Sequence, residues 1–134
     1  MIKQLAHICI HSSNLNRTEA FYVEGLGMER FFDFNRDGQL FGFYLKAGTN
    51  TFIEVFKGEP GNPGNINHVA LEVNDMEALL QRLRDQGFSH SEKKLGADQS
   101  WQAWLEDPDG VRIELHEYTA ESSQLTGRTC VVDW

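Results

Sequence analysis

One pairing of residues occurs twice along this chain of 134 residues. His7 lies 47 positions before Glu54, and His68 lies 46 positions before Glu114. Each of the four stands in a short apolar run typical of a β-strand, where a carboxylate is rare unless its charge has a partner. Imidazoles and carboxylates are ligands of many divalent metal ions. The pattern therefore predicts a metal site built from a duplicated unit.

The segments around these residues follow the same plan in both halves of the chain. A strand leads into a helix that ends at a glycine, and three further strands follow. The expected strands are 5–11, 28–34, 39–47 and 51–57 in the first half, and 66–73, a run from Phe88, 99–107 and 110–118 in the second. We predict an α+β fold in which two βαβββ modules form one domain with curved mixed sheets and a cleft. The modules span about 3–57 and 66–118, and a tail covers 119–134.

Local signals fix the helix starts and the direction of the side chains. Asn14 in the first module and Asn74 or Asp75 in the second are expected to cap the helices. Since side chains alternate along a strand, Ile8 and Ile10 can pack under a helix while His7 points the opposite way. The same alternation holds in the second module, so all four residues of the duplicated pairs are expected on the sheet faces turned away from the helices.

Composition excludes several classes of function. The chain is 40% hydrophobic and 24% charged, as in ordinary globular proteins, and its formal net charge of −8 argues against nucleic-acid binding. No apolar run is long enough to cross a bilayer, and the N-terminus lacks the pattern of a secretory signal, so we expect a cytoplasmic protein that does not bind membranes. Cys9 and Cys130 are expected to be free thiols, with Cys9 filling a gap in the core.

Three stretches carry a resemblance to a known family. They are HICIHSSNLNRTEAFYVEGLGM, NHVALEVNDMEALLQRLRDQG and LEDPDGVRIELHEY, of which the last is the most specific. With them the chain resembles the vicinal oxygen chelate superfamily, which includes glyoxalase I, bleomycin-resistance proteins and ring-cleaving dioxygenases. The resemblance covers residues 1–118 and implies the two-module fold expected above.

The resemblance also implies a metal centre and a chemistry. Its metal ligands fall on His7, Glu54, His68 and Glu114, and this four-ligand set is closest to that of glyoxalase I. It implies one divalent ion per site (Ni²⁺, Co²⁺, Zn²⁺, Mn²⁺ or Fe²⁺), no organic cofactor, and lyase or isomerase chemistry on a small α-hydroxycarbonyl or acyl substrate through a metal-bound enediolate. Glu114 or Glu54 is the expected base, and the resemblance favours Glu114. In relatives of this length two chains form a homodimer that shares each site, so we expect a homodimer.

Five further residues are candidate substrate contacts: His11, Arg112, His116, Phe52 and Phe56. His11 and His116 are equally typical of structural residues, and Arg112 could hold an anionic group or pair with a carboxylate such as Glu72. Phe52 and Phe56 share the face of Glu54 but are also typical of core positions. In bacterial glyoxalase I, two residues that help to hold glutathione match His11 and Gly58 here, which are different types. The sequence therefore leaves the substrate open, including whether it contains glutathione.

Two alternatives to the glyoxalase chemistry also fit the sequence. A ring-cleaving dioxygenase on the same fold would use two histidines and one carboxylate and leave positions open for oxygen. A non-enzymatic drug-binding protein, similar to the bleomycin-resistance proteins, would use the same cleft without the metal ligands.

Overall fold

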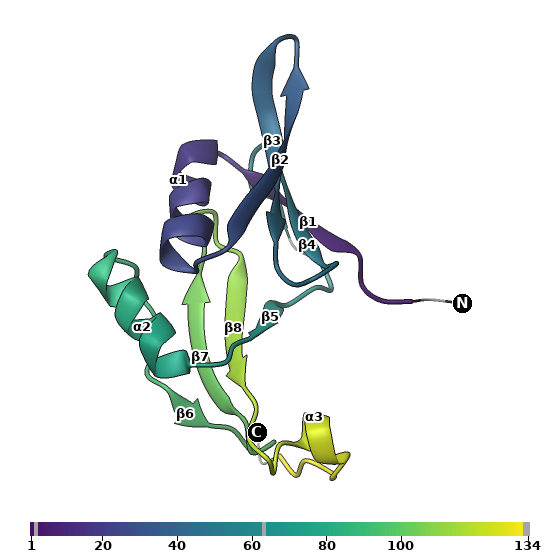
Figure 1. Cartoon of the computed structure of the whole chain (residues 1–134), viewed down its shortest axis with the longest axis vertical. Helices are drawn as coiled ribbons and strands as arrows, with labels where there is room; N and C mark the ends of the chain where they lie inside the picture. The colour runs from purple at the N-terminus through teal and green to yellow at the C-terminus, as the bar shows by residue number, and fades with distance from the viewer. Residues whose placement is uncertain (2, 63, 133–134) are drawn as a thin grey trace. The chain divides into compact units, whose positions relative to one another are not determined.

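The computed structural model describes residues 1, 3–62 and 64–132 of the chain. It divides into two compact units, one of Met1–Gly64 with Asp107–Val111 and one of Asn65–Glu106 with Arg112–Trp134. Each unit holds one open, mixed four-stranded sheet (Figure 1), so the predicted α+β class is confirmed. The expected cleft and the union of the two modules in one domain stay predictions. In the described residues, no helix has the length and apolar character needed to cross a membrane.

The first unit has the predicted βαβββ plan. Its elements are β1 (His7–Ser12), α1 (Leu15–Glu19), the π-helix η1 (Ala20–Gly25), β2 (Glu29–Arg36), β3 (Gln39–Lys46) and β4 (Phe52–Lys57). The strand order is β1-β4-β3-β2, with β1 parallel to β4 and the other pairs antiparallel. Figure 1 shows β2 and β3 as a long hairpin. The first and last strands of the module are therefore neighbours.

The second unit repeats this plan with shorter elements. They are β5 (Val69–Glu72), α2 (Met76–Asp85), β6 (Lys94–Leu95), β7 (Trp101–Glu106), β8 (Arg112–Glu117) and α3 (Ser123–Thr126). The order is β5-β8-β7-β6, and β5 is parallel to β8. The strand predicted over 66–73 is shorter than expected, and the run from Phe88 contributes only the two residues of β6. The tail forms a short helix that was not predicted, and its residues 133–134 lie outside the described residues.

Both main helices begin at the predicted caps. The side chain of Asn14 accepts a hydrogen bond from the backbone N–H of Arg17 at 3.1 Å. The side chain of Asp75, not Asn74, accepts one from the backbone N–H of Ala78 at 3.0 Å. In each case the cap satisfies an N–H group that the first helical turn leaves without a partner.

The first helix differs from its prediction in its second half. From Ala20 the turns widen into the π form, and the N–H of Leu26 donates to the carbonyl of Phe21 at 3.0 Å. The wider turn coincides with two consecutive buried aromatic residues, Phe21 and Tyr22, which are 2% and 1% exposed. Gly27, with a φ of +75°, follows the helix in the left-handed conformation that glycine adopts without strain.

Strand alternation sorts the side chains as expected. Ile10, Ile53 and Val55 are buried in the first unit. His7 and Glu54 alternate with these core residues along the same strands, so they lie on the opposite face. In the second unit, Ile113 and Leu115 are buried in the same way on either side of Glu114.

The turn Asp107–Gly110 between β7 and β8 is built around one buried carboxylate. Asp107 Oδ1 accepts hydrogen bonds from the N–H groups of Asp109 at 2.8 Å and Val111 at 2.9 Å, and its Oδ2 accepts one from the Tyr22 hydroxyl at 2.9 Å. Burial raises the pKa of Asp107, and these hydrogen bonds counter part of the rise. Burial and the nearby charge of Asp107 raise the pKa of Tyr22 well above its usual value, so its hydroxyl remains a donor.

We expect Asp107→Ala to lower the free energy of unfolding by about 2–4 kcal/mol, since it leaves a buried tyrosine hydroxyl and two N–H groups without an acceptor. The measurement is urea unfolding followed by circular dichroism. Asp107→Asn is the matched control, because its side chain keeps an acceptor for both N–H groups, and we expect it to lose about 1 kcal/mol. Equal stability of the alanine variant and the wild type would contradict this role of the turn.

Candidate metal centre

The first donor pair, His7 and Glu54, lies on the neighbouring parallel strands β1 and β4. Cys9 is the backbone partner of Glu54, and His7 is two residues before it on the same face. His7 Nε2 lies 3.4 Å from Glu54 Oε2. The imidazole is open to solvent while the carboxylate is mostly covered, so the pair presents its two donor atoms at the surface of the first unit.

The second donor pair, His68 and Glu114, repeats this geometry in the second unit. Ala70 on β5 is the backbone partner of Glu114 on β8, and His68 is again two residues before the partner of the glutamate. His68 Nε2 lies 3.3 Å from Glu114 Oε2. The pattern that is duplicated in the sequence is thus duplicated in side-chain geometry.

The N···O distances in both pairs are longer than the usual range for an N–H···O hydrogen bond, about 2.7–3.2 Å. A divalent ion held at about 2.1 Å by both an imidazole nitrogen and a carboxylate oxygen separates those atoms by about 3.0–3.4 Å. Each pair therefore has the spacing of two ligands of one ion. Among the described residues, no group of three or more His, Cys, Asp or Glu side chains is placed to hold a metal ion.

Asn67 determines which nitrogen of His68 carries a proton. Arg112 Nη1 donates to Asn67 Oδ1 at 3.1 Å, and since a guanidinium only donates, this amide atom is the oxygen. The same oxygen lies 3.0 Å from His68 Nδ1, which therefore carries the N–H. A neutral imidazole protonated there presents a lone pair at Nε2, toward the Glu114 carboxylate. With the imidazole in this neutral form, a cation between the two donors would relieve their mutual repulsion.

Glu114 also contacts a second imidazole. His116 Nε2 lies 3.0 Å from Glu114 Oε1, and both residues are 8% exposed. This nitrogen is buried and, in the structure, has no hydrogen-bond partner. The Glu114 carboxylate is thus flanked by His68 at one oxygen and His116 at the other. The predicted role of His116 as a substrate contact stays a prediction.

Each donor pair has an aromatic neighbour on the third strand of its sheet, which sequence reasoning missed. Tyr44 on β3 is the backbone partner of Glu54, and its hydroxyl lies 3.3 Å from His7 Nδ1. Trp104 on β7 is the backbone partner of Glu114, and its ring centroid lies 4.9 Å from that of His68. Tyr44 and Trp104 are separated by the same 60 positions as the two glutamates. That offset is the sequence signal that could have found them.

The prediction that Cys9 fills the core was wrong. Cys9 is exposed, because strand alternation places it on the same face as His7 and Glu54. Partial burial and the charge of Glu54 raise the pKa of its thiol. A thiol that stays protonated is a poor nucleophile, so Cys9 has no catalytic signature. Both cysteines are free, as expected.

The structure bears on one of the two roles expected for Arg112, the salt bridge to Glu72. Its guanidinium donates to Asn67 and lies 5.0 Å from the centroid of the Trp104 ring. Among the described residues no ion pair involves Arg112, so a salt bridge to Glu72 is not observed. Arg112 supports the orientation of Asn67 and through it that of His68. Contact with a substrate anion stays a prediction.

The other predicted substrate contacts lie on the first unit. Phe52 and Phe56 flank Glu54 on its own face of β4, as expected. His11 is exposed at the end of β1 and packs against Gly58, where an added Cβ would lie 3.3 Å from the His11 ring. The two positions that the resemblance matches to glutathione contacts in bacterial glyoxalase I are therefore adjacent in this chain. One holds the imidazole of His11, and the other, Gly58, has no side chain.

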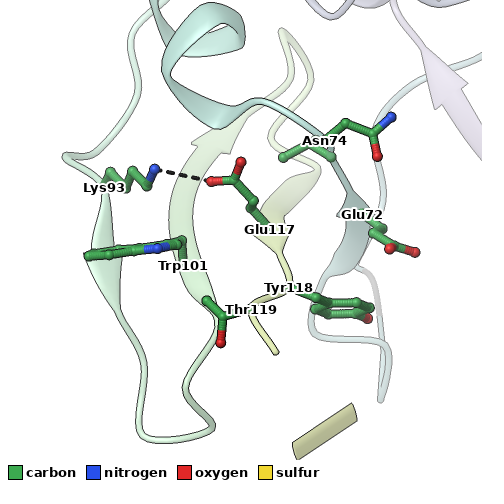
Figure 2. Close-up of a pocket in the computed structure, with 8 residues that line it drawn as sticks. Glu72, Asn74, Lys93, Trp101, Glu117, Tyr118 and Thr119 are labelled. Carbon is green, nitrogen blue, oxygen red and sulfur yellow. Dashed lines mark ion pairs between the residues drawn. The ribbon is translucent and has the colours of Figure 1, made fainter. Parts of the chain in front are cut away.

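The second unit also contains a pocket of about 470 Å³ that the sequence did not predict (Figure 2). It is lined by Glu72, Val73, Asn74, Lys93, Trp101, Glu117, Tyr118 and Thr119. Lys93 Nζ lies 3.0 Å from Glu117 Oε2 and 4.8 Å from the centroid of the Trp101 ring. Since its lining does not include His68 or Glu114, this pocket is separate from the second donor pair.

Comparison with known proteins identifies the family. The sequence model of the Glyoxalase/Bleomycin resistance protein/Dioxygenase superfamily matches residues 4–115. A probable lactoylglutathione lyase from Synechocystis sp. is 30% identical over 123 residues, which cover 83% of this chain and 92% of that protein.

Two solved structures show the same fold. A glyoxalase family protein from Enterococcus faecalis has a TM-score of 0.69 and 29% identity, covering 86% of this chain and 98% of its own. TnmS3, an antibiotic binding protein from Streptomyces sp. CB03234, has a TM-score of 0.74 and 23% identity, covering 88% and 98%. With the family match spanning most of its length, this chain belongs to the glyoxalase/bleomycin resistance protein/dioxygenase superfamily.

Proposed function

We propose that this protein is a divalent-metal-dependent lyase or isomerase of the glyoxalase type. It moves a proton between adjacent carbon atoms of a small α-hydroxycarbonyl or acyl compound, through an enediolate. The observation that supports this most directly is the repeated donor pair, with N···O distances of 3.4 Å and 3.3 Å at equivalent places in the two sheets. Membership of the superfamily and the likeness to a probable lactoylglutathione lyase point the same way.

The donor atoms fit a divalent ion. His7, Glu54, His68 and Glu114 would hold it, and mixed imidazole and carboxylate donors suit Ni²⁺, Co²⁺, Zn²⁺, Mn²⁺ or Fe²⁺. When bound, such an ion supplies a Lewis acid that polarises a substrate oxygen and makes the neighbouring C–H more acidic. The protonation of His68 on Nδ1, set by Asn67, keeps the Nε2 lone pair free for this purpose.

Glu114 is the candidate general base. It would take the proton from one carbon and return it to the next. Its two oxygens have different neighbours, with Oε2 beside His68 and Oε1 beside His116. The carboxylate can therefore turn toward a substrate at one oxygen while the other keeps an imidazole partner. Glu54, the carboxylate of the first donor pair, is the alternative base.

We also propose that two chains form a homodimer in which the first donor pair of one chain and the second donor pair of its partner share one site. Each pair supplies two donors, and two-fold symmetry would then create two equivalent four-ligand sites.

The first test is metal content. We expect the purified protein to hold about one divalent ion per chain, and Glu54→Gln to lower both metal occupancy and isomerase activity on methylglyoxal hemithioacetals by at least about tenfold, because a charged ligand is lost. Emission spectrometry of the protein and a coupled absorbance assay provide the two readouts. Glu106→Gln, which changes an exposed strand carboxylate outside both donor pairs, is the matched control and should leave both unchanged.

Other results would favour the other chemistries of the superfamily. Full occupancy and activity in Glu54→Gln would indicate a three-ligand mechanism. Oxygen uptake with a catechol by the Fe²⁺-loaded protein, without isomerase activity, would favour a dioxygenase. Negligible metal and no turnover would favour a binding function, such as that of the antibiotic-binding structural neighbour.

The second test concerns the neighbour of His68. We expect Asn67→Ala to weaken divalent metal affinity by about 10–100-fold, since Nδ1 loses the acceptor that fixes the position of its proton. Competition against a chelating dye measures this affinity. Asn65→Ala is the matched control: it removes an exposed asparagine from the same unit and should leave the metal affinity unchanged. Equal affinity of Asn67→Ala and wild type would show that the Arg112–Asn67–His68 chain does not support metal binding.

The third test is complementation between chains. His7→Ala and His68→Ala should each be inactive as homodimers. Co-expression of the two should restore about a quarter of wild-type activity, because half of the dimers are mixed and each mixed dimer regains one intact site. No recovery on mixing, or a metal-replete monomer in gel filtration, would contradict the shared site.

A further inference from the structure

A β-bulge places two phenylalanines on the face of the first donor pair. Arg30 pairs with Leu45 and Asp33 pairs with Phe43, so two residues of β2, Phe31 and Phe32, lie opposite the single residue Tyr44 of β3. The two rings are 52% and 42% exposed. A regular ladder would send one of them to the opposite face, so the bulge brings an additional ring to this surface.

These rings belong to a continuous group that we call the aromatic platform, made of Phe31, Phe32, Phe34, Tyr44, Phe52 and Phe56. Phe32 stacks on Tyr44 with centroids 4.4 Å apart and an interplanar angle of 21°. Phe31 stacks on Phe52 at 5.9 Å and 11°. Phe34 contacts Phe56 at 4.9 Å. The stacked rings hold one another in place, so the platform is ordered before any ligand binds.

The platform is continuous with the first donor pair. Tyr44 Oη lies 3.3 Å from His7 Nδ1, and Phe52 is the backbone partner of His7. Phe52 and Phe56 precede and follow Glu54 on β4. A small molecule held at His7 and Glu54 by its oxygens therefore has aromatic rings beside it on the same face.

The cations of β2 and β3 already have partners. Lys46 forms an ion pair with Glu29 at 2.9 Å, and Arg30 forms one with Glu19 at 2.8 Å. The guanidinium of Arg36 lies 3.6 Å from the centroid of the Phe41 ring. Lys46 Nζ also lies 4.7 Å from the centroid of the Phe31 ring, so one cation, paired with Glu29, borders the platform. The strands thus offer mainly stacking surface, which favours a flat apolar group over a peptide with several carboxylates.

We propose that the aromatic platform binds an aromatic ring of the substrate, next to the oxygens that reach the metal ligands. This inference rests on the proposed function for the position of those oxygens. It narrows the substrate class to aryl-substituted α-hydroxycarbonyl or acyl compounds.

Two hydroxamates that differ only in the ring test this class. Acetohydroxamate and benzohydroxamate carry the same pair of adjacent oxygens, and only the second has a phenyl ring. We expect the metal-loaded protein to bind benzohydroxamate about tenfold more tightly in isothermal titration calorimetry, from ring stacking and burial. Phe32→Leu keeps apolar bulk without a ring and should remove most of this preference. Leu40→Ala, on the same sheet outside the platform, should preserve it.

The outcomes separate the platform from the metal centre. Failure of acetohydroxamate to bind, together with Phe32-dependent binding of benzohydroxamate, would support the platform and count against the proposed metal chemistry. Equal affinity for the two hydroxamates, or a preference unchanged in Phe32→Leu, would overturn the platform while leaving the metal chemistry in place. No benzohydroxamate binding would overturn it as well. A change of molar mass in Phe32→Leu with an unchanged preference would identify the platform as a contact between copies of the chain, which also overturns the proposal.

Discussion

The parallel pairing of the first and last strands of each unit is the constraint on which the candidate site depends. Parallel strands need a long connection, and here a helix and two intervening strands provide it. The pairing of β1 with β4 and of β5 with β8 brings together side chains 46 or 47 positions apart in the sequence. Because the histidine stands two residues before the glutamate's partner in both units, the same diagonal contact forms twice. Burial of Ile53, Val55, Ile113 and Leu115 under the helices fixes the register, since a shift by one residue would turn the glutamates into the core.

The sequence predicted the features that periodicity and caps encode. Strand alternation correctly oriented His7 and Glu54, and Asn14 and Asp75 cap the helices where short polar side chains precede an apolar repeat. Strand alternation also places Cys9 on the same face as His7 and Glu54. The prediction of a buried Cys9 relied instead on the general preference of cysteine for the core, and it was wrong. The π turn after Ala20 was not predicted; it coincides with the burial of the consecutive residues Phe21 and Tyr22.

Features that arise from the pairing of strands could not be predicted from the sequence alone. Tyr44 and Trp104 reach the donor pairs as backbone partners of the glutamates, which requires the register of a third strand. The bulge at Phe31 and Phe32 likewise exists only relative to β3. The position of Arg112, two residues before Glu114, left two roles open, an anion contact and a salt bridge. The structure adds a third, since its guanidinium donates to Asn67, which contacts His68; contact with a substrate anion stays a prediction.

In the first unit, the donor pair and most of the aromatic platform lie on different strands. The neighbouring strands β1 and β4 carry the first donor pair, His7 and Glu54. The hairpin of β2 and β3 supplies most of the aromatic platform, and because it pairs with β4 through backbone hydrogen bonds, its side chains can change while His7 and Glu54 stay in place. Substrate preference can therefore vary on the hairpin at little cost to the donor pair. The two positions that the resemblance matches to glutathione contacts, His11 on β1 and Gly58 after β4, lie outside this hairpin, so their residue types do not alter its part of the platform.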